Sequence, residues 1–254
     1  MGILVTNVDS FANICTSLTL EGAQSRLEFH SLPRIHFHQR LDALKDKLLA
    51  MAALAQQAVQ AAVDAYLQRD AALCEYVQDN EAAINLAHRE VDEMAYELLA
   101  QEQPMAIDLR FILAVIKINS DLERIGDQAM GIARRTRDLL EYDSTELPVD
   151  INGMGEVASR MIRTAIQALL DADALVADSV RDMDDEIDRM NRVARKGLIG
   201  VIQQTPDVTI QALNGILISR GLERIADHAS NIAADVIFWV RGADVRHQLS
   251  LAVD

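Results

Sequence analysis

Apolar residues recur every three or four positions along most of the chain, which is the spacing of one face of an α-helix. In the first half this pattern predicts helices at 35–68, from about 70–80 to 103, and at about 107–140. Proline cannot continue a helix, so it marks the ends of such segments. The four prolines are Pro33, Pro104, Pro148 and Pro206. The pattern therefore predicts an all-α fold.

The second half of the chain repeats the first half. Residues 113–135 aligned with 213–235 share 11 of 23 identities, and earlier segments align at an offset of 103. Three antiparallel helices with one apolar stripe each can bury those stripes against one another. We therefore predict two tandem, pseudo-symmetric three-helix bundles built from six long helices.

The pattern also predicts the domain organisation. The first bundle is expected at 35–141 and the second at 154–242, joined by a polar linker at 142–153 that contains proline and glycine. Residues 1–34 have no clear period and are interpreted as an N-terminal extension, poorly ordered or wrongly included at the start. Residues 243–254 are expected to be a C-terminal tail.

Composition and charge exclude several classes of fold and function. Apolar residues make up 50% of the chain and aromatic residues only 4%, which favours packed helices over sheet. The 24 basic and 39 acidic residues give a net charge of −15, which argues against nucleic-acid binding. Cys15 and Cys74 match no metal or redox spacing. With no long apolar run and no secretory signal, we expect a cytoplasmic protein that is not an integral membrane protein.

The repeated core carries paired carboxylates. The sequence Leu-Glu-Arg-Ile-x-Asp occurs twice and places Glu123 with Asp127, and Glu223 with Asp227, on one helical face. The preceding helix of each half offers a matching row. This row is Glu81 and Asn85 in the first half and Asp184 and Asp188 in the second.

Two interpretations of these carboxylates stay open. Carboxylate oxygens from two packed helices are hard ligands that could bind Mg²⁺, Ca²⁺, Mn²⁺ or iron, and helical bundles often build multinuclear sites in this way. Acidic residues are equally common on solvated helix faces, where Arg124 and Arg224 could neutralise them. The common catalytic motifs are missing, so an enzyme is not expected. His88 and His228 are interpreted as solvated polar residues, and His36 and His38 suit capping or a partner contact as well as metal.

Taken together, these motifs closely resemble the PhoU family over residues 36–242. The resemblance rests on a Leu-Arg pair before an apolar run and on the two Leu-Glu-Arg-Ile-x-Asp repeats, with supporting residues near the start of the first two helices. The residues are Leu109-Arg110, Ser120 to Asp127, Leu222 to Ala233, His36-Phe37-His38 and Ile84-Asn85. The family fold is two three-helix bundles related by pseudo-symmetry, in agreement with the repeat.

The resemblance implies a cytoplasmic negative regulator of phosphate uptake and of phosphate-starvation signalling. Such a protein acts as an adaptor between the ATP-binding subunit of the phosphate ABC transporter and a phosphate-sensing histidine kinase, and we expect a homodimer. Some members bind iron, zinc or other cations in multinuclear clusters at their acidic motifs, and others show none. For this chain no cofactor is required, and the candidate metals are iron, zinc, manganese or magnesium. Here the acidic motifs fall on Glu123 with Asp127, Glu223 with Asp227, and Asp184 with Asp188, whereas Glu81 with Asn85 departs from the pattern. The alternative function is a metal-storage or redox bundle that uses the same carboxylates.

Overall fold

The computed structural model describes the backbone of residues 9–242 and the side chains of residues 35–242. The predicted tail at 243–254 and the side chains of the predicted extension at 1–34 lie outside these described residues, so both expectations stay predictions. The chain divides into two compact units, residues 1–43 and residues 44–254. Both predicted three-helix bundles, from residue 44 onward, fall in the second unit.

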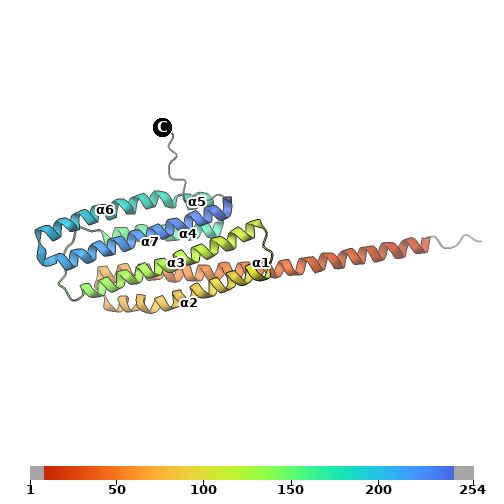
Figure 1. The fold of residues 1–254 in the computed structure, drawn as a ribbon, viewed down its shortest axis with the longest axis horizontal. Coiled ribbons are helices and arrows are strands. Elements are labelled where there is room, and N and C mark those ends of the chain that lie inside the picture. The colour runs from red at the N-terminus through yellow and green to blue at the C-terminus, as the bar shows by residue number, and fades with distance from the viewer. Residues whose placement is uncertain (1–8, 243–254) are drawn as a thin grey trace, which may run out of the picture. The chain divides into compact units, whose positions relative to one another are not determined.

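Within the described residues the chain is all-α, as predicted, and contains six long helices (Figure 1). They are α1 (Asp9–Gln68), α2 (Ala71–Gln101), α3 (Ala106–Leu139), α4 (Ile151–Asp171), α6 (Val180–Gln204) and α7 (Thr209–Arg241). A short helix, α5 (Ala174–Asp178), leads into α6, and the 3₁₀ turn η1 (Pro206–Val208) precedes α7. Helix α1 begins upstream of the predicted position 35, and α4 begins inside the predicted linker 142–153.

The turn between the first two helices of each half is built in the same way. Arg69 and Ala172, which are 103 residues apart, both adopt a left-handed conformation, with φ of 54° and 50°. The aspartate that follows each of them caps the next helix. Asp70 accepts a hydrogen bond from the Ala72 amide at 2.7 Å, and Asp173 accepts one from the Leu175 amide at 2.8 Å. The repeat thus extends from sequence to local backbone geometry.

Small residues allow the helices to approach closely. A Cβ atom on Gly126 of α3 would lie 3.0 Å from Cδ1 of Ile84 on α2, and one on Gly155 of α4 would lie 2.8 Å from Val63 on α1.

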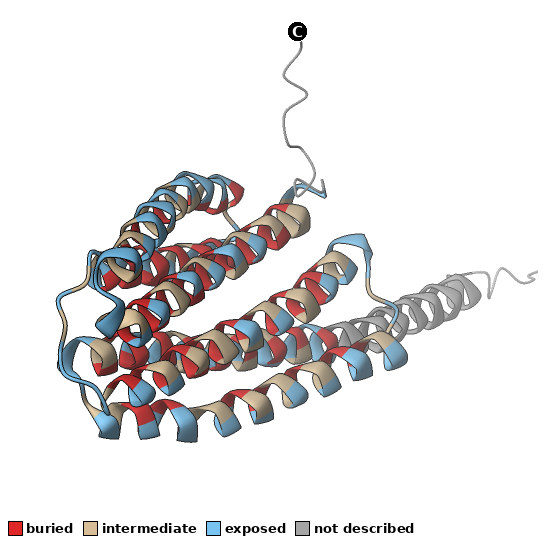
Figure 2. Cartoon of the chain, turned by 60° about the vertical axis from the view of Figure 1, so that its left-hand side comes forward, coloured by how far each residue is buried: buried red, intermediate tan, exposed pale blue. Residues whose placement is uncertain are grey.

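Buried positions form a continuous stripe along each helix of residues 44–242, with exposed positions on the outer faces (Figure 2). Residues 111–120 and 211–220 follow an identical order of buried, intermediate and exposed positions.

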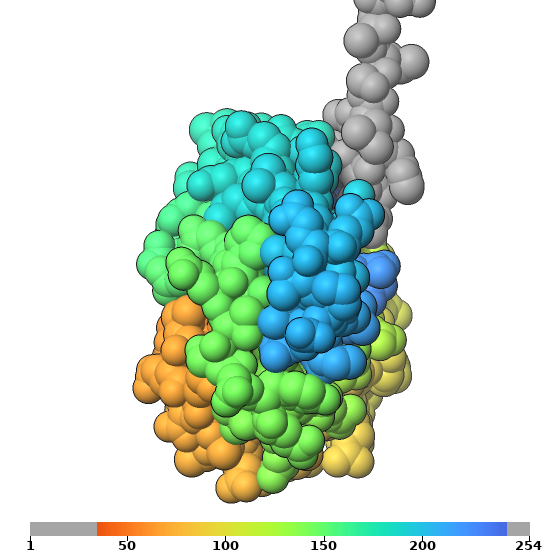
Figure 3. All heavy atoms as spheres, turned by 90° about the vertical axis from the view of Figure 1, so that its left-hand side faces the viewer, coloured from red at the N-terminus to blue at the C-terminus, as the bar shows by residue number. Residues whose placement is uncertain are grey.

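The two halves join along α3 and α7, which lie side by side and run antiparallel (Figures 1 and 3). At one end Phe111 packs on the Trp239 ring with centroids 4.9 Å apart, and farther along Gly221 lies against Ile132. Between them, Lys117 Nζ lies 3.3 Å from Oδ1 of Asp235, a carboxylate that is 2% exposed. Each central helix is therefore buried on two sides, against its own bundle and against the other.

Residues Ile35–Gln68 form a described segment long and apolar enough to cross a membrane. However, 56% of its most apolar window is buried inside the protein. In α1 these apolar positions include Leu44, Leu48 and Met51, all fully buried. This is the behaviour of a core helix of a bundle.

Candidate functional site

The four predicted carboxylates of the second repeat form one electrostatic cluster. Asp184 and Asp188 lie on α6, and Glu223 and Asp227 lie on α7. Partial burial, together with the charges of Glu223, Asp184 and Asp188, raises the pKa of Asp227 to about 6, while His228 acts in the opposite direction. Burial also raises the pKa of Glu223, and Asp188 and Asp184 add to the rise. The structure therefore brings together carboxylates from two helices, and their like charges add to the rise in the pKa values of Asp184, Glu223 and Asp227.

Asp184 is the most constrained member of this cluster. Burial raises its pKa, and Asp188 and Asp185 add to the rise, whereas the nearby Ser230 hydroxyl favours the charged form. Among the described residues, Asp184 Oδ1 and Ser230 Oγ are both buried without a partner in hydrogen-bonding geometry. Because both oxygens are buried, a cation or a bound water would complete their coordination.

The carboxylates of the first repeat are arranged differently. Arg124, between them in sequence, contacts both: its Nε lies 3.5 Å from Glu123 Oε2 and its Nη1 lies 3.4 Å from Asp127 Oδ2. Glu81 and Asn85 lie on the facing helix α2, where Ile84 packs against Gly126 of α3. In the first repeat the Arg124 guanidinium thus already lies between the two acids. On α2, Asn85 offers a neutral oxygen in place of a carboxylate. Neutralisation by Arg124, one of the two open interpretations, applies to this repeat.

The donor chemistry of the second cluster fits a hard cation. Its ligands are carboxylate oxygens, one of which is buried without a partner. Among the described residues, however, no three His, Cys, Asp or Glu side chains converge closely enough to hold a metal ion in their present positions. Side chains would have to rotate inward to coordinate a metal, and mutual repulsion of the charged forms opposes that rotation while no cation is bound.

A second polar group lies at the seam between the repeats and was not predicted. His228 Nδ1 lies 2.8 Å from Asp121 Oδ1, and Asn231 Nδ2 donates to the same oxygen at 3.3 Å. The interpretation of His228 as a polar surface residue did not include this contact. Asp121 directly precedes the first Leu-Glu-Arg-Ile-x-Asp motif, but its partner is 107 residues away, so no local spacing could have identified the pair.

Polar contacts inside each bundle also correspond between the repeats. Asn119 of α3 donates to the His88 carbonyl and to Asp92 of α2, both at 2.9 Å. At the corresponding position of α7, the Ser219 hydroxyl lies 3.2 Å from Asn191 of α6. Asn119 and Ser219 are buried, so their hydrogen bonds fix the register of the second and third helices on which the acidic rows depend.

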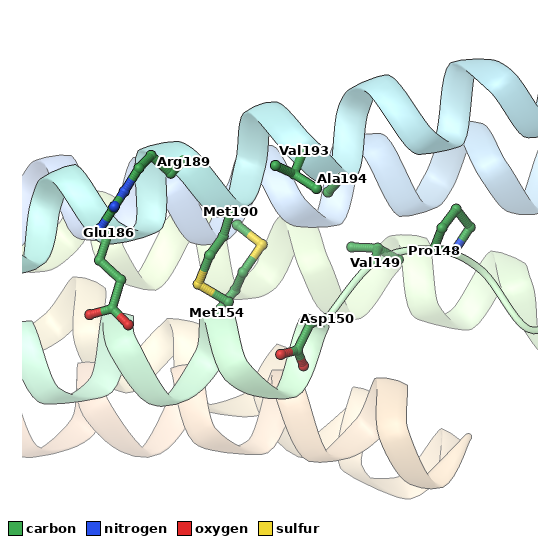
Figure 4. Close-up of a pocket in the computed structure, with 9 residues that line it drawn as sticks. All are labelled: Pro148, Val149, Asp150, Met154, Glu186, Arg189, Met190, Val193 and Ala194. Atoms are coloured by element: carbon green, nitrogen blue, oxygen red, sulfur yellow. The ribbon is translucent and has the colours of Figure 1, made fainter.

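An apolar pocket lies apart from the predicted site carboxylates. It has a volume of about 340 Å³ and lies between the linker, α4 and α6. Met154 and Met190 point toward one another in it, to the left of Val149 and Pro148 in Figure 4. It contains none of the predicted site residues.

Comparisons with known proteins agree with this architecture. The family model described as the PhoU domain matches twice, at residues 48–136 and 151–236. A phosphate-specific transport system accessory protein PhoU homolog from Pseudomonas aeruginosa is 39% identical over 83% of this chain and 88% of its own length. A corresponding homolog 1 from Thermotoga maritima is 29% identical over 85% of this chain and 93% of its own length.

Solved structures show the same fold. The crystal structure of PhoU from Pseudomonas aeruginosa matches with a TM-score of 0.79 and 38% identity, covering 82% of this chain and all of that chain. The phosphate transport system regulatory protein PhoU from Streptococcus pneumoniae matches with a TM-score of 0.76 and 26% identity, covering 82% of this chain and 99% of that one. With both repeats matched by the family model, the chain belongs to the PhoU family.

Proposed function

We propose that this protein is a cytoplasmic negative regulator of phosphate uptake and of phosphate-starvation signalling. It acts by contact, as an adaptor between the ATP-binding subunit of the phosphate ABC transporter and a phosphate-sensing histidine kinase, and it carries out no turnover. The observation that carries the proposal is family membership over both repeats, together with relatives described as accessory proteins of phosphate-specific transport. The storage or redox alternative gains no comparable support.

The test of this function is genetic. Deletion of the gene in the host is expected to switch on a phosphate-starvation reporter at high phosphate, and the wild-type chain is expected to switch it off again. A reporter that stays silent in the deletion strain would end the adaptor proposal. Copurification of the wild-type chain with the tagged transporter ATPase, and separately with the tagged kinase, then tests each of the two proposed contacts.

We further propose that the acidic cluster of the second repeat is the better cation site of the two. Asp184, Asp188, Glu223 and Asp227 supply four carboxylates. Arg192 contacts Asp188 at 3.3 Å, but among the described residues no arginine forms a salt bridge with the other three, whereas Arg124 contacts both acids of the first repeat. The ions expected from the family are iron, zinc, manganese or magnesium, held as a multinuclear cluster. A bound cation would stabilise the charged carboxylates and compensate the burial of Asp184.

Elemental analysis of protein purified without affinity-tag metal tests this proposal. The matched variants carry Glu223→Ala with Asp227→Ala in one protein, and Glu123→Ala with Asp127→Ala in the other. We expect metal in the wild type, most of it lost from the second-repeat variant and most retained by the first-repeat variant. Circular dichroism confirms that each variant is folded. Equal metal in all three proteins, or none in the wild type, would contradict the assignment.

A further inference from the structure

A second pocket lies where α1 and α3 end and α7 begins, at the junction of the two repeats (Figure 1). We call it the junction pocket, and its volume of about 440 Å³ is in the range of sites that bind small molecules. Its polar lining comes from each of these helix ends: Tyr66 and Arg69 from α1 and the turn after it, Thr136 from α3, and Gln211 from α7. Leucine side chains form its apolar walls, and linker residues 143–147 complete it. It contains none of the carboxylates of the candidate metal site.

Two buried polar side chains of the junction pocket lack hydrogen-bond partners. Thr136 is 1% exposed and Gln211 is 9% exposed. Among the described residues, five buried side-chain atoms have no partner, and two of them are Thr136 Oγ1 and Gln211 Oε1. An unpaired buried hydroxyl or amide opposes folding, so such groups in native proteins are usually paired with protein, water or a ligand. Two of them in the lining of one pocket therefore indicate a polar molecule that binds there.

Arg69 supplies a fixed positive charge at the junction pocket. Its Nη2 donates to the Leu139 carbonyl at 3.0 Å and to the Tyr142 carbonyl at 2.6 Å, which holds the guanidinium at the start of the linker. Among the described residues it forms no salt bridge. Burial raises the pKa of the Tyr66 hydroxyl, and the nearby Arg69 charge acts in the opposite direction. The hydroxyl is therefore protonated at neutral pH and lies close to the guanidinium, so the two can donate to the same anionic group.

The duplication provides an apolar version of the same place for comparison. The positions that correspond to the four polar residues of the pocket, 100 or 103 residues away, are all apolar. They are Leu169, Ala172, Val236 and Phe111, in place of Tyr66, Arg69, Thr136 and Gln211. There Phe111 packs on Trp239, with ring centroids 4.9 Å apart, and Leu139 stands in place of that tryptophan at the junction pocket. The fold is therefore compatible with an apolar, aromatic-filled junction, so packing alone does not require the polar pocket.

The chemistry of the lining selects a small molecule that carries both charges. The Arg69 guanidinium beside the Tyr66 hydroxyl suits a single carboxylate. Gln211 Oε1 lacks a donor, and an ammonium group supplies one. Asp143 and Glu146, on the linker side of the pocket, favour a positive group and disfavour a polyanion such as a nucleotide. The leucine walls suit a short carbon chain.

We propose that the junction pocket binds a small zwitterion of the α-amino-acid class. Its carboxylate lies against Arg69 and Tyr66, and its carbon chain lies against the leucines. Its ammonium group donates to Gln211, whose amide turns about its side-chain bonds to meet it. Because both repeats and the linker line the pocket, the bound molecule contacts all three and stabilises their arrangement. The proposal does not rest on the regulatory role or on bound metal, so its failure would leave both untouched.

The test screens the full-length chain by thermal denaturation against the standard amino acids, inorganic phosphate, ATP and glucose, each supplied separately at about 10 mM. At least one amino acid is expected to raise the melting temperature, and isothermal titration calorimetry then gives its dissociation constant. Hydrogen exchange locates the site: the amino acid is expected to slow exchange of the backbone amides in the linker segment 140–147. No binding of any amino acid, binding of phosphate, ATP or glucose in their place, or protection only elsewhere in the chain would overturn the proposal.

Variants of the lining test the assignment of its residues. Thr136→Val with Gln211→Phe copies the apolar junction, and we expect the dissociation constant to rise at least about tenfold. Without ligand its urea midpoint is expected to rise, because the unpartnered polar atoms are gone. Tyr66→Phe removes one oxygen with little risk to folding and is expected to raise the dissociation constant at least about fivefold. Tyr76→Phe, at an exposed tyrosine of α2, is the matched control and should bind as the wild type does. Circular dichroism confirms that each variant is folded, and wild-type affinity in both pocket variants would overturn the proposal.

Discussion

Replacement of Asp227 by asparagine is expected to stabilise the protein, and to do so increasingly as the pH rises. In the folded chain the pKa of Asp227 is about 6, because the carboxylate is partly buried and lies near Glu223, Asp184 and Asp188. In the unfolded chain these causes disappear and the ordinary value of 3.8 applies. The charged form therefore opposes folding, and the amide removes that charge.

The sign and the pH range follow from the two pKa values. Below 3.8 both folded and unfolded chains hold the proton, so this charge contributes nothing. Between 3.8 and about 6 the folded chain holds a proton that the unfolded chain has released, so stability falls as the pH rises. Above about pH 6 both the folded and the unfolded chain have released the proton, and the loss of stability is complete.

The size of the effect is bounded by the same two values. The difference between about 6 and 3.8 corresponds to about 3 kcal/mol as an upper limit. Asp227 is exposed on its outer side, and solvent screening there reduces the expected gain to about 1 kcal/mol. Asp227→Asn should therefore raise the free energy of unfolding by about 1 kcal/mol near pH 7.5 and by much less near pH 4.5.

Urea denaturation followed by circular dichroism, in the presence of a chelator, measures this difference. The matched control is Asp127→Asn in the first repeat, which removes the 3.4 Å contact with Arg124 and should leave stability unchanged or lower by up to about 1 kcal/mol. A destabilised Asp227→Asn variant, or a gain that does not depend on pH, would refute the description of this cluster as mutually repelling carboxylates.

Three further changes test packing and the turns by urea denaturation. Gly155→Ala should destabilise by about 1–3 kcal/mol, because its new Cβ would lie 2.8 Å from Val63, and an unchanged midpoint would contradict the close α1–α4 contact. Lys117→Met should cost about 1–2 kcal/mol by removing a partner of the buried Asp235 carboxylate, and a neutral result would argue against that role. Arg69→Gly should cost about 1 kcal/mol less than Arg69→Ala, because glycine relieves the φ of 54°; equal losses would contradict the strain.

The fold could be predicted from the sequence because the duplication shows the same pattern twice. Local signals also located the turns, since Asp70 and Asp173 cap helices 103 residues apart. The helix break at Ser179 was not predicted, because the apolar spacing continues across it. Periodicity shows which side of a helix is buried, but not which helix covers it. For this reason the double burial of α3 and α7 appears only in the structure.

The sequence predicted which residues form the candidate site, but not which side chains surround each of them. Spacing placed Glu123 with Asp127 and Glu223 with Asp227 in equivalent positions, and nothing in the motif separates them. In the structure Arg124 contacts both carboxylates of the first pair, whereas Asp227 of the second pair has a pKa of about 6. That difference depends on side-chain placement across two helices. The pairing of Asp121 with His228 likewise depends on the packing of two repeats that are distant in sequence.

The most direct test of the central claim, that this PhoU-family chain restrains phosphate transport, is the initial rate of radiolabelled phosphate uptake at high external phosphate. Uptake is compared in the host, in a strain lacking the gene, and in that strain with the gene restored. The account predicts faster uptake in the strain without the gene and a return to the host rate on restoration. Uptake that is the same in all three strains would contradict it.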